Sequence, residues 1–354
     1  MMLVTFAKSL WKQPCEQPSI NSPFLQVPAE LLSYIATFLA PADAVLLSQT
    51  CRSMRARLGK HSNTARLSCA DQFAYLAGIA RDLPEKWVCD YCLALHPINK
   101  RDKPTAERRP CSCPLYSFQK SWLRTRLHNH YHIAIEHHHV QLALKYTRLQ
   151  QRKYDSYLQD LLKPYQERPF STMSYTSITH QARYSAYPRI VTGSDGNPKF
   201  LLFSVWKYLA GGRDIMFHRL GCQRICPHLK FLDYDYDKYN NSLLHTVRWA
   251  LHKSGMEWRN SCARCATDFS AMLCGRNLYL QVWQDLGPEG SPLDLAWRSQ
   301  NIYPGVDGVT NSAEAGPSLH HKAGSIQKLY GPVPASLPAP DSKSDWYCFP
   351  PNSL

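Results

Sequence analysis

Residues 23–58 read PFLQVPAELLSYIATFLAPADAVLLSQTCRSMRARL, and their pattern decides how the N-terminal part of the chain folds. Pro28 suits the first position of a helix, where its missing N–H costs no hydrogen bond. Leu31, Ile35 and Phe38 then recur at the spacing of a single helical face. We therefore predict a helix with one apolar face that begins at Pro28.

Two further helices are predicted in the same stretch. Pro41 ends the first helix, and Asp43 can cap the second through its carboxylate. Thr50 can cap a separate last helix, which Gly59 can end. The apolar residues that continue a helical face are Leu47, Cys51, Met54 and Leu58.

Three such short helices cannot bury all of these apolar side chains among themselves. Each Leu or Phe covered by a partner would contribute roughly 1.5–3 kcal/mol to an interface. We therefore interpret the stretch as a docking module. The alternative is an ordinary three-helix core segment without a partner.

The same stretch resembles an F-box. The matching residues are Val27-Pro28, Glu30-Leu31-Leu32, Ile35, Phe38-Leu39, Pro41-Ala42-Asp43, Leu46-Leu47 and Thr50-Cys51-Arg52. The resemblance implies a non-catalytic subunit that binds the Skp adaptor and, through it, a cullin, so that a target protein is held at an SCF-type ubiquitin ligase. The adaptor contacts that it implies are Pro28, Leu31, Leu32, Ile35, Phe38, Leu39 and Leu46.

Several later segments resemble fungal F-box-containing proteins. They are Ala80-Arg81-Asp82-Leu83-Pro84 with Trp87, Cys89 and Cys92, then His139–Leu149, Cys226-Pro227-His228-Leu229, Cys262–Phe269 and Trp283–Gly287. The resemblance covers the chain in patches from residue 23 to about residue 300, and it supplies no substrate.

The chain has 354 residues and a formal net charge of +14. Its basic residues are scattered among acidic ones, apart from concentrations at Lys100–Arg109 and Lys120–Arg126. Such scattering is typical of a solvated surface. An acidic or nucleic-acid partner is the alternative, for which a basic surface would supply salt-dependent attraction.

The sequence also indicates a compartment. No run approaches the ~20 apolar residues of a transmembrane helix. The first residues are interrupted by Lys8 and Lys12, unlike the apolar core of a secretory signal. Thirteen cysteines, an odd number, then predict reduced thiols in the cytoplasm or nucleus.

We predict an α+β fold with five regions. They are a disordered lead (1–22), a three-helix F-box (23–60), a helical region with a Cys cluster and one long helix (61–165), a mixed, strand-rich body with a second Cys cluster (166–300) and a disordered tail rich in Gly, Ser, Pro and Ala (301–354).

Individual elements follow from periodicity and turn residues. The long helix is expected at Val140–Leu162 and ends before Pro164, and a shorter helix is expected at Leu67–Ala80. The turn Ser194–Pro198 between two apolar runs predicts a β-hairpin. The two runs are Tyr184–Val191 and Phe200–Tyr208. Two further strands are expected at Asp214–Leu220 and Asn277–Gln284, and Leu244–Leu251 is a further candidate element.

Two Cys-x-x-Cys pairs have the spacing of zinc ligands, because two thiolates two residues apart can bind one tetrahedral ion. Each pair needs further ligands. For Cys89 and Cys92 the candidates are Cys111 and Cys113, with His96 in reserve. For Cys262 and Cys265 they are Cys222 and Cys226, with His228 also preceding the pair. The alternative is that these are free, buried thiols.

Enzyme signatures are missing from the sequence. It has no Gly-rich phosphate loop, no G-x-S-x-G elbow and no H-E-x-x-H, so we expect no catalyst. The histidines between His128 and His139 precede the long helix and are mostly expected as surface or capping groups, although one of them could complete the first zinc site. Two other hypotheses remain: a zinc-containing nucleic-acid-binding or scaffold protein without a ligase role, and an F-box protein that acts with the adaptor alone.

Overall fold

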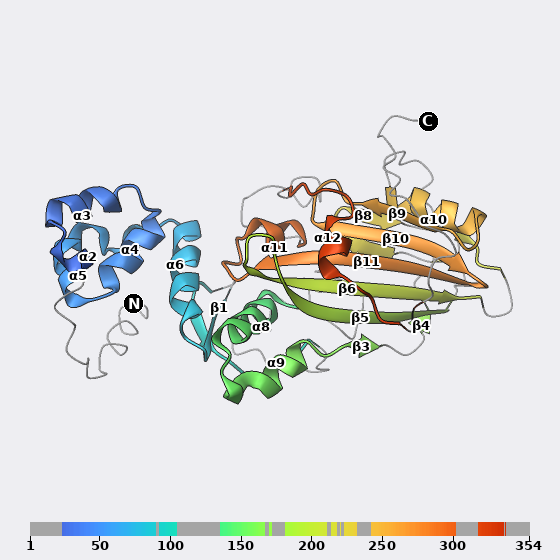
Figure 1. Cartoon of the computed structure of the whole chain (residues 1–354), viewed down its shortest axis with the longest axis horizontal. Helices are drawn as coiled ribbons and strands as arrows, with labels where there is room; N and C mark the ends of the chain where they lie inside the picture. The colour runs from blue at the N-terminus through green and yellow to red at the C-terminus, as the bar shows by residue number, and fades with distance from the viewer. Residues whose placement is uncertain are drawn as a thin grey trace. The chain divides into compact units, whose positions relative to one another are not determined.

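The computed structural model describes residues 23–89, 92–104, 135–166, 170–171, 181–210, 214–217, 220, 223–231, 242–301, 318–335 and 337. The chain divides into two units, Met1–Ile98 and Asn99–Leu354, and the boundary falls inside the predicted region 61–165. The α+β class is confirmed, because helices make up the N-terminal part and a strand-rich sheet the C-terminal part (Figure 1). The predicted lead, 1–22, lies outside the described residues.

Short helices build the first unit. They are α2 (Pro23–Gln26), α3 (Ala29–Ala36), α4 (Pro41–Gln49), α5 (Arg52–Arg57) and α6 (Cys69–Arg81), with the 3₁₀ turns η2 (Gly59–His61) and η3 (Thr64–Arg66) between α5 and α6. The α2–α5 segment has a small core of its own. Leu32 and Ala36 of α3 pack there with Met54 and Leu58.

Two predicted caps in this unit are corrected. No side chain caps α4; Pro41 opens this helix instead of ending the one before it, and Asp43 lies in its first turn. Cys51, rather than Thr50, caps α5, because its Sγ accepts the Met54 N–H at 3.4 Å. The Thr50 hydroxyl instead donates to the Leu47 carbonyl at 2.8 Å, so it closes the preceding helix.

The expected helix at Leu67–Ala80 is confirmed as α6. Ser68 caps it by accepting the Asp71 N–H at 3.1 Å. A small antiparallel hairpin follows, made of β1 (Lys86–Val88) and β2 (Leu95–Pro97). Leu93 lies in the turn with a φ of 50°, in the left-handed region.

An antiparallel sheet dominates the second unit (Figure 1). Its strands run in the order β3-β5-β6-β11-β10-β9, and β4 also pairs with β5. Their bounds are β3 (Tyr165–Gln166), β4 (Phe170–Ser171), β5 (Gln181–Thr192), β6 (Pro198–Leu209), β9 (Glu257–Ser261), β10 (Thr267–Cys274) and β11 (Asn277–Pro288). A separate hairpin consists of β7 (Gln223–Cys226) and β8 (Leu229–Phe231).

The predicted hairpin is confirmed as β5–β6. In its turn Gly196 adopts a φ of 77°, and Asp195 accepts the Asn197 N–H at 3.1 Å. The strand predicted at Asn277–Gln284 is confirmed within β11. The strand predicted at Asp214–Leu220 is wrong for its described residues, none of which lies in a strand.

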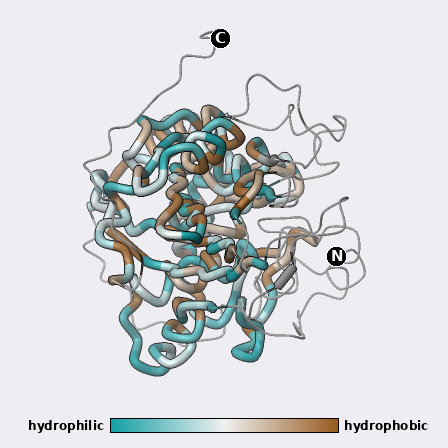
Figure 2. Tube along the Cα trace, turned by 90° about the vertical axis from the view of Figure 1, so that its right-hand side faces the viewer, coloured by the Kyte–Doolittle hydropathy of each residue, from teal (hydrophilic) through white to brown (hydrophobic). Residues whose placement is uncertain are grey.

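Alternation along β6 gives the sheet two different faces. Leu201, Phe203 and Val205 face one core cluster together with Trp283 of β11. The residues between them point to the other face, where the β7–β8 hairpin lies: the Tyr208 hydroxyl donates to Gln223 at 3.2 Å. Figure 2 shows how hydrophobic and hydrophilic stretches alternate along the trace.

The single long helix predicted at Val140–Leu162 is wrong. The structure has α8 (His137–Leu149), the 3₁₀ turn η4 (Arg152–Tyr154) and α9 (Asp155–Leu161). Gln150 ends α8 in the left-handed conformation, with a φ of 51°. This break lets Tyr154 stack on Tyr146 with ring centroids 4.4 Å apart, a contact that one straight helix could not make.

Three further helices complete the unit. They are α10 (Ser242–His252), which includes the element expected at Leu244–Leu251, α11 (Leu295–Ser299) and α12 (Ser325–Tyr330). The predicted disordered tail is therefore wrong for residues 318–335. Ile326 and Tyr330 of α12 are buried against Phe203 and Trp283 of the sheet. Composition averaged over 301–354 hides this short apolar segment.

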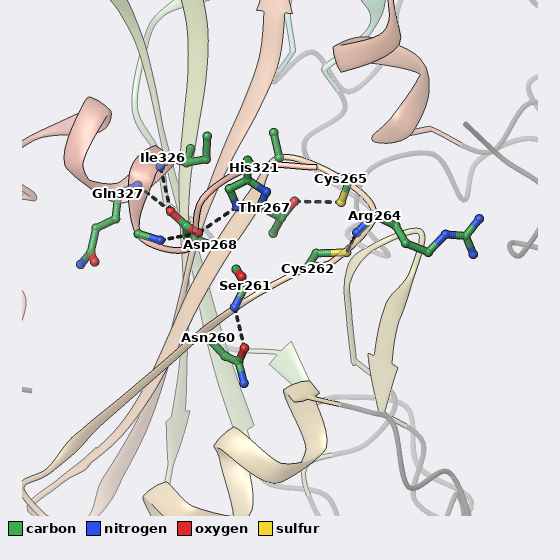
Figure 3. A network of polar contacts seen from close by, with 12 residues as sticks. Asn260, Ser261, Cys262, Arg264, Cys265, Thr267, Asp268, His321, Ile326 and Gln327 are labelled. Carbon is green, nitrogen blue, oxygen red and sulfur yellow. Dashed lines mark hydrogen bonds and ion pairs between the residues drawn. The ribbon is translucent and has the colours of Figure 1, made fainter. Parts of the chain in front are cut away.

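A buried carboxylate holds this segment to the sheet (Figure 3). Asp268 Oδ1 accepts from His321 Nε2 at 3.0 Å and from the Gly324 N–H at 3.1 Å. Its Oδ2 accepts the N–H groups of Ile326 and Gln327 at 2.8 and 3.0 Å. Asp268 thus caps α12 from another element, since these are N–H groups that a helix cannot satisfy internally.

We expect Asp268→Ala to lower the free energy of unfolding by about 3–5 kcal/mol, because it leaves buried donors and a buried histidine without their acceptor. Chymotrypsin cleavage after Tyr330, followed by mass spectrometry, should become much faster. Asp214→Ala, at a position whose side chain is 92% exposed, is the matched control and should leave both readouts unchanged. Equal cleavage of the Asp268 variant and the wild type would contradict this role.

Candidate metal centre and exposed helical face

Three cysteines and one histidine converge in the second unit. Cys226 ends β7, and His228 lies in the turn that leads into β8. Cys262 and Cys265 lie in the loop that joins β9 to β10. Their ligand atoms all lie within 4.8 Å of one another, so this cluster, the four-ligand cluster, could hold a metal ion.

Three of the four residues predicted for this cluster are brought together. The fourth, Cys222, lies outside the described residues, and His228 supplies the remaining ligand. The signal for His228 was the Cys-Pro-His sequence itself, because a tight turn after Cys226 places a ligand two residues on beside the first. The sequence reasoning favoured the sulfur of Cys222 over this imidazole.

The local geometry suits the binding of one ion by the Cys226–His228 segment and the Cys262–Cys265 segment together. The Sγ of Cys262 lies 3.7 Å from Nδ1 of His228. The Arg264 N–H points at the Cys262 Sγ at 3.4 Å, a contact that favours a thiolate there. All three cysteines are buried, which keeps water away from the sulfur atoms.

The pKa values of the three thiols are shifted in different directions. Hydrogen bonds from Cys226 and Cys265, followed by one from His228, hold the pKa of Cys262 well below its ordinary value. Burial raises the pKa values of Cys226 and Cys265. Because a bound cation takes thiolate ligands and displaces thiol protons, metal binding at this cluster would depend on pH.

The first Cys pair lies on the β1–β2 hairpin of the other unit. Cys92 Sγ is 2.9 Å from His96 Nε2, and these residues form a second candidate group with the buried Cys89. The reserve ligand His96 is thus the one that the structure brings in. The predicted ligands Cys111 and Cys113 lie outside the described residues.

A third group consists of Asp102, His138 and His139, all buried. His138 Nε2 lies 3.1 Å from Asp102 Oδ2, and His139 Nε2 lies 3.3 Å from Oδ1. Burial alone would raise the pKa of Asp102, but the hydrogen bonds from the two histidines outweigh it and lower the pKa. Sequence reasoning missed this group, because nothing in the sequence relates Asp102 to residues so far along the chain.

The tautomer of His139 argues against a metal in this third group. Its Nδ1 accepts the Glu136 N–H at 3.1 Å, so the proton of the neutral ring is on Nε2. That nitrogen therefore donates to Asp102 and offers no lone pair to a cation. We interpret Asp102, His138 and His139 as a hydrogen-bonded network that anchors the start of α8.

His137 and His139 make the stability of this unit depend on pH. Burial lowers the pKa of His137 to about 3 and that of His139 to about 4, and the nearby His138 lowers both further. Both side chains stay neutral in the folded protein while the unfolded chain takes up protons below pH ~6.5. Their contribution is therefore complete above pH ~6.5 and is lost as the pH falls toward the folded pKa values.

Between pH 7.5 and pH 5.0 the unfolded chain protonates His137 and the folded protein does not, which lowers the free energy of unfolding by about 2 kcal/mol. We expect His137→Phe to remove this part of the stability loss that the wild type shows over the same range. Phenylalanine keeps a ring beside Trp297, whose centroid lies 5.2 Å from that of His137. Urea unfolding at the two pH values measures the effect. His252→Phe, at an exposed position of α10, is the control. Identical pH dependence in all three proteins would contradict the argument.

Helix α3 of the first unit carries apolar residues both toward the core of the unit and on a second, exposed side. Leu32 and Ala36 face the core of the unit. On the other side Leu31 is 54% exposed, Tyr34 63% and Ile35 40%, and Phe38 just beyond the helix is 72% exposed. Tyr34 and Phe38 form an edge-to-face pair with ring centroids 4.9 Å apart. We call Leu31, Tyr34, Ile35 and Phe38 the exposed α3 face.

The residues predicted to contact a partner thus separate into two sets. Leu31, Ile35 and Phe38 lie on the exposed α3 face, and Pro28 before it is also exposed. Leu32 is corrected: it is fully buried in the core of its own unit. Leu39 and Leu46 are half-buried. Leu46 packs toward α6, where a Cβ added at Gly78 would lie 2.5 Å from its Cδ1.

Comparison with known proteins gives no relative to which these features could be referred. No protein-family model, no curated protein and no solved structure matches the chain. Within the described part of the chain, none of the helices combines the length and the apolar character that crossing a membrane requires.

Proposed function

We propose that this chain is a non-catalytic receptor subunit of an SCF-type ubiquitin ligase. In this proposal the exposed α3 face binds the Skp adaptor, and the second unit presents a target protein. The observation that carries it is that α3 has apolar residues beyond its core-facing side, and that the described residues of its unit cover only that core-facing side. A contiguous exposed apolar patch is typical of an interaction surface.

The exposed α3 face has the composition of a binding hot spot. A few residues carry most of the energy of typical protein interfaces, and aromatic side chains are enriched at such interfaces. Tyr34 and Phe38 supply two such rings, and Leu31 and Ile35 flank them. Covering each of these side chains would contribute roughly 1.5–3 kcal/mol. Tyr34 was not among the predicted contacts, and we add it to the adaptor interface.

The function of such a subunit is proximity. A receptor that holds a target lysine near a charged conjugating enzyme replaces a bimolecular encounter by an effective concentration. The chemistry then belongs to other subunits, which agrees with the expectation of no catalyst from the sequence.

We expect Leu31→Asp combined with Ile35→Asp to abolish copurification of a Skp adaptor, because two charges would be buried at the interface. Both positions are exposed, so circular dichroism and the unfolding midpoint should stay as in wild type. Gln26→Asp with Ala56→Asp adds the same charges at exposed positions outside the exposed α3 face and should still copurify.

The two possible failures of this experiment have different meanings. Unchanged adaptor binding by the Leu31, Ile35 variant would refute the assigned face. An adaptor that copurifies with wild type in the absence of any cullin would place the protein outside a ligase, and no adaptor at all would refute the proposal.

The proposal includes a structural zinc ion at the four-ligand cluster. Zinc prefers four tetrahedral sulfur and nitrogen ligands, with Zn–S near 2.3 Å and Zn–N near 2.0–2.1 Å, which puts a sulfur and a nitrogen ligand about 3.6 Å apart. The 3.7 Å between Cys262 Sγ and His228 Nδ1 supports this assignment. The zinc would neutralise the thiolates and tie the β7–β8 hairpin to the β9–β10 loop.

We expect the purified protein to carry zinc and Cys265→Ser to lose one equivalent of it, measured by inductively coupled plasma mass spectrometry. The variant should also unfold at lower urea, because metal binding adds to folding free energy. Cys69→Ser, at an exposed cysteine of α6 outside every cluster, should keep the wild-type zinc content. A folded, metal-free wild type would remove zinc from the proposal but would leave adaptor binding untouched.

A further inference from the structure

The four-ligand cluster is assembled from two arms that are far apart in the sequence. One arm carries Cys226 and His228, and the other carries Cys262 and Cys265. Among the described residues, neither arm alone supplies more than two ligands. A site that binds its ion tightly needs both arms held in place before the ion arrives, so the groups that join the arms are of interest.

Two buried glutamines lie between the arms. Gln284 belongs to β11, and Gln300 follows α11. Both side chains are completely buried. Gln284 Nε2 donates to Gln300 Oε1 at 3.0 Å, so the two amides form a direct pair.

Each amide of the pair also donates to one arm. Gln284 Nε2 donates its other proton to the carbonyl of Ile225, the residue before Cys226, at 3.2 Å. Gln300 Nε2 donates to the carbonyl of Ala266, the residue after Cys265, at 3.0 Å. The pair therefore bridges the backbones of the two arms next to their ligands.

The bridge continues to a ligand sulfur through Thr267. Gln300 Nε2 lies 3.0 Å from Thr267 Oγ1 and donates to it. Cys265 Sγ lies 3.2 Å from the same hydroxyl oxygen, and in the metal-free cluster either atom can be the donor (Figure 3). A metal-bound Cys265 has no proton, so the Thr267 hydroxyl is then the donor of this contact, and Gln300 Oε1 at 3.3 Å is its other acceptor. A hydroxyl that donates to a thiolate stabilises its charge and withdraws electron density from it.

The orientation of Gln284 comes at a cost. With both of its protons used, Gln284 Oε1 is buried and has no hydrogen-bond partner among the residues that the structure describes. The reverse orientation of the amide would place this oxygen against the oxygens of Ile225 and Gln300. The orientation with both Nε2 protons on the bridge is therefore the one that leaves the fewest polar atoms in conflict.

We propose that Gln284 and Gln300 are positioning residues of the metal centre. They hold the Cys226–His228 arm and the Cys262–Cys265 arm at the spacing that one ion needs, and through Thr267 they stabilise the charge of the Cys265 thiolate. This inference rests on the zinc site proposed above and is independent of adaptor binding.

The first test is the zinc affinity of the full-length protein, measured by competition with a chromophoric chelator. Gln284→Leu should bind zinc 10–100-fold more weakly than wild type, the usual loss when a group behind a metal ligand is removed. Gln281→Leu is the matched control, since it changes the same residue type on the same strand, and alternation points this side chain to the opposite face of the sheet. Its zinc affinity should equal that of wild type.

A second pair of variants tests the tuning of the sulfur. In protein loaded with Co²⁺ as the probe metal, Thr267→Val should shift the sulfur-to-cobalt charge-transfer band to lower energy, because the thiolate loses its hydrogen-bond donor. Thr267→Ser keeps the hydroxyl and should restore the wild-type band. A change that merely loosened the fold would move the unfolding midpoint and not this band.

The outcomes are distinguishable. If wild type binds no zinc, the metal centre itself is refuted. If wild type binds zinc and Gln284→Leu binds as tightly as Gln281→Leu, the bridging role is overturned. Should Gln284→Leu fail to fold, the cobalt spectra decide, and identical bands for Thr267→Val and wild type overturn the proposal.

Discussion

The alternation of side chains at the start of β10 is the constraint on which much of the second unit depends. Thr267 and Asp268 are neighbours in the chain, so the pleat sends them to opposite faces of the sheet. Thr267 contacts Gln300 and Cys265 on one face, and Asp268 holds α12 and His321 on the other. The loop before them carries two thiols of the four-ligand cluster, and its Arg264 carbonyl accepts the Leu319 N–H at 2.9 Å. One short segment thus joins the four-ligand cluster, the sheet and α12.

Local signals in the sequence predicted the local structure well. The turn Ser194–Pro198 predicted the β5–β6 hairpin because its glycine and aspartate act within a few residues of themselves. Period-based reasoning likewise found α6, α10 and β11. It failed for the long helix, because the chain turns at Gln150 in the left-handed conformation and Tyr154 stacks back on Tyr146, a contact that apolar spacing does not reveal. It failed also for α12, whose few apolar residues become helical only against the sheet and under the carboxylate of Asp268.

The candidate sites show the same difference between local and tertiary signals. A Cys-x-x-Cys pair is a local pattern, and the sequence predicted both pairs as candidate ligands. The partner ligands are matters of tertiary structure: His228 meets Cys262 only because the β7–β8 hairpin lies against the β9–β10 loop. The pairing of Asp102 with His138, and the bridge formed by Gln284 and Gln300, join residues without any shared motif. On α3 the sequence indicated an apolar surface, but only the packing of Leu32 against Met54 and Leu58 separates the inward residues from the outward ones.

The two units differ in how their large exposed apolar side chains are distributed. The described large apolar side chains that remain exposed are Leu31, Tyr34, Ile35, Phe38, Met216, Trp249 and Leu295. The first four gather on α3 and its end, whereas the last three belong to separate segments, and Trp249 already stacks on Trp258 with centroids 5.3 Å apart. In the second unit other segments of the same chain cover the sheet, and α12 is one of them. On α3, by contrast, the described residues leave a contiguous apolar face exposed, and contiguous exposed apolar patches favour association. The proposed adaptor is the cover that this face would receive.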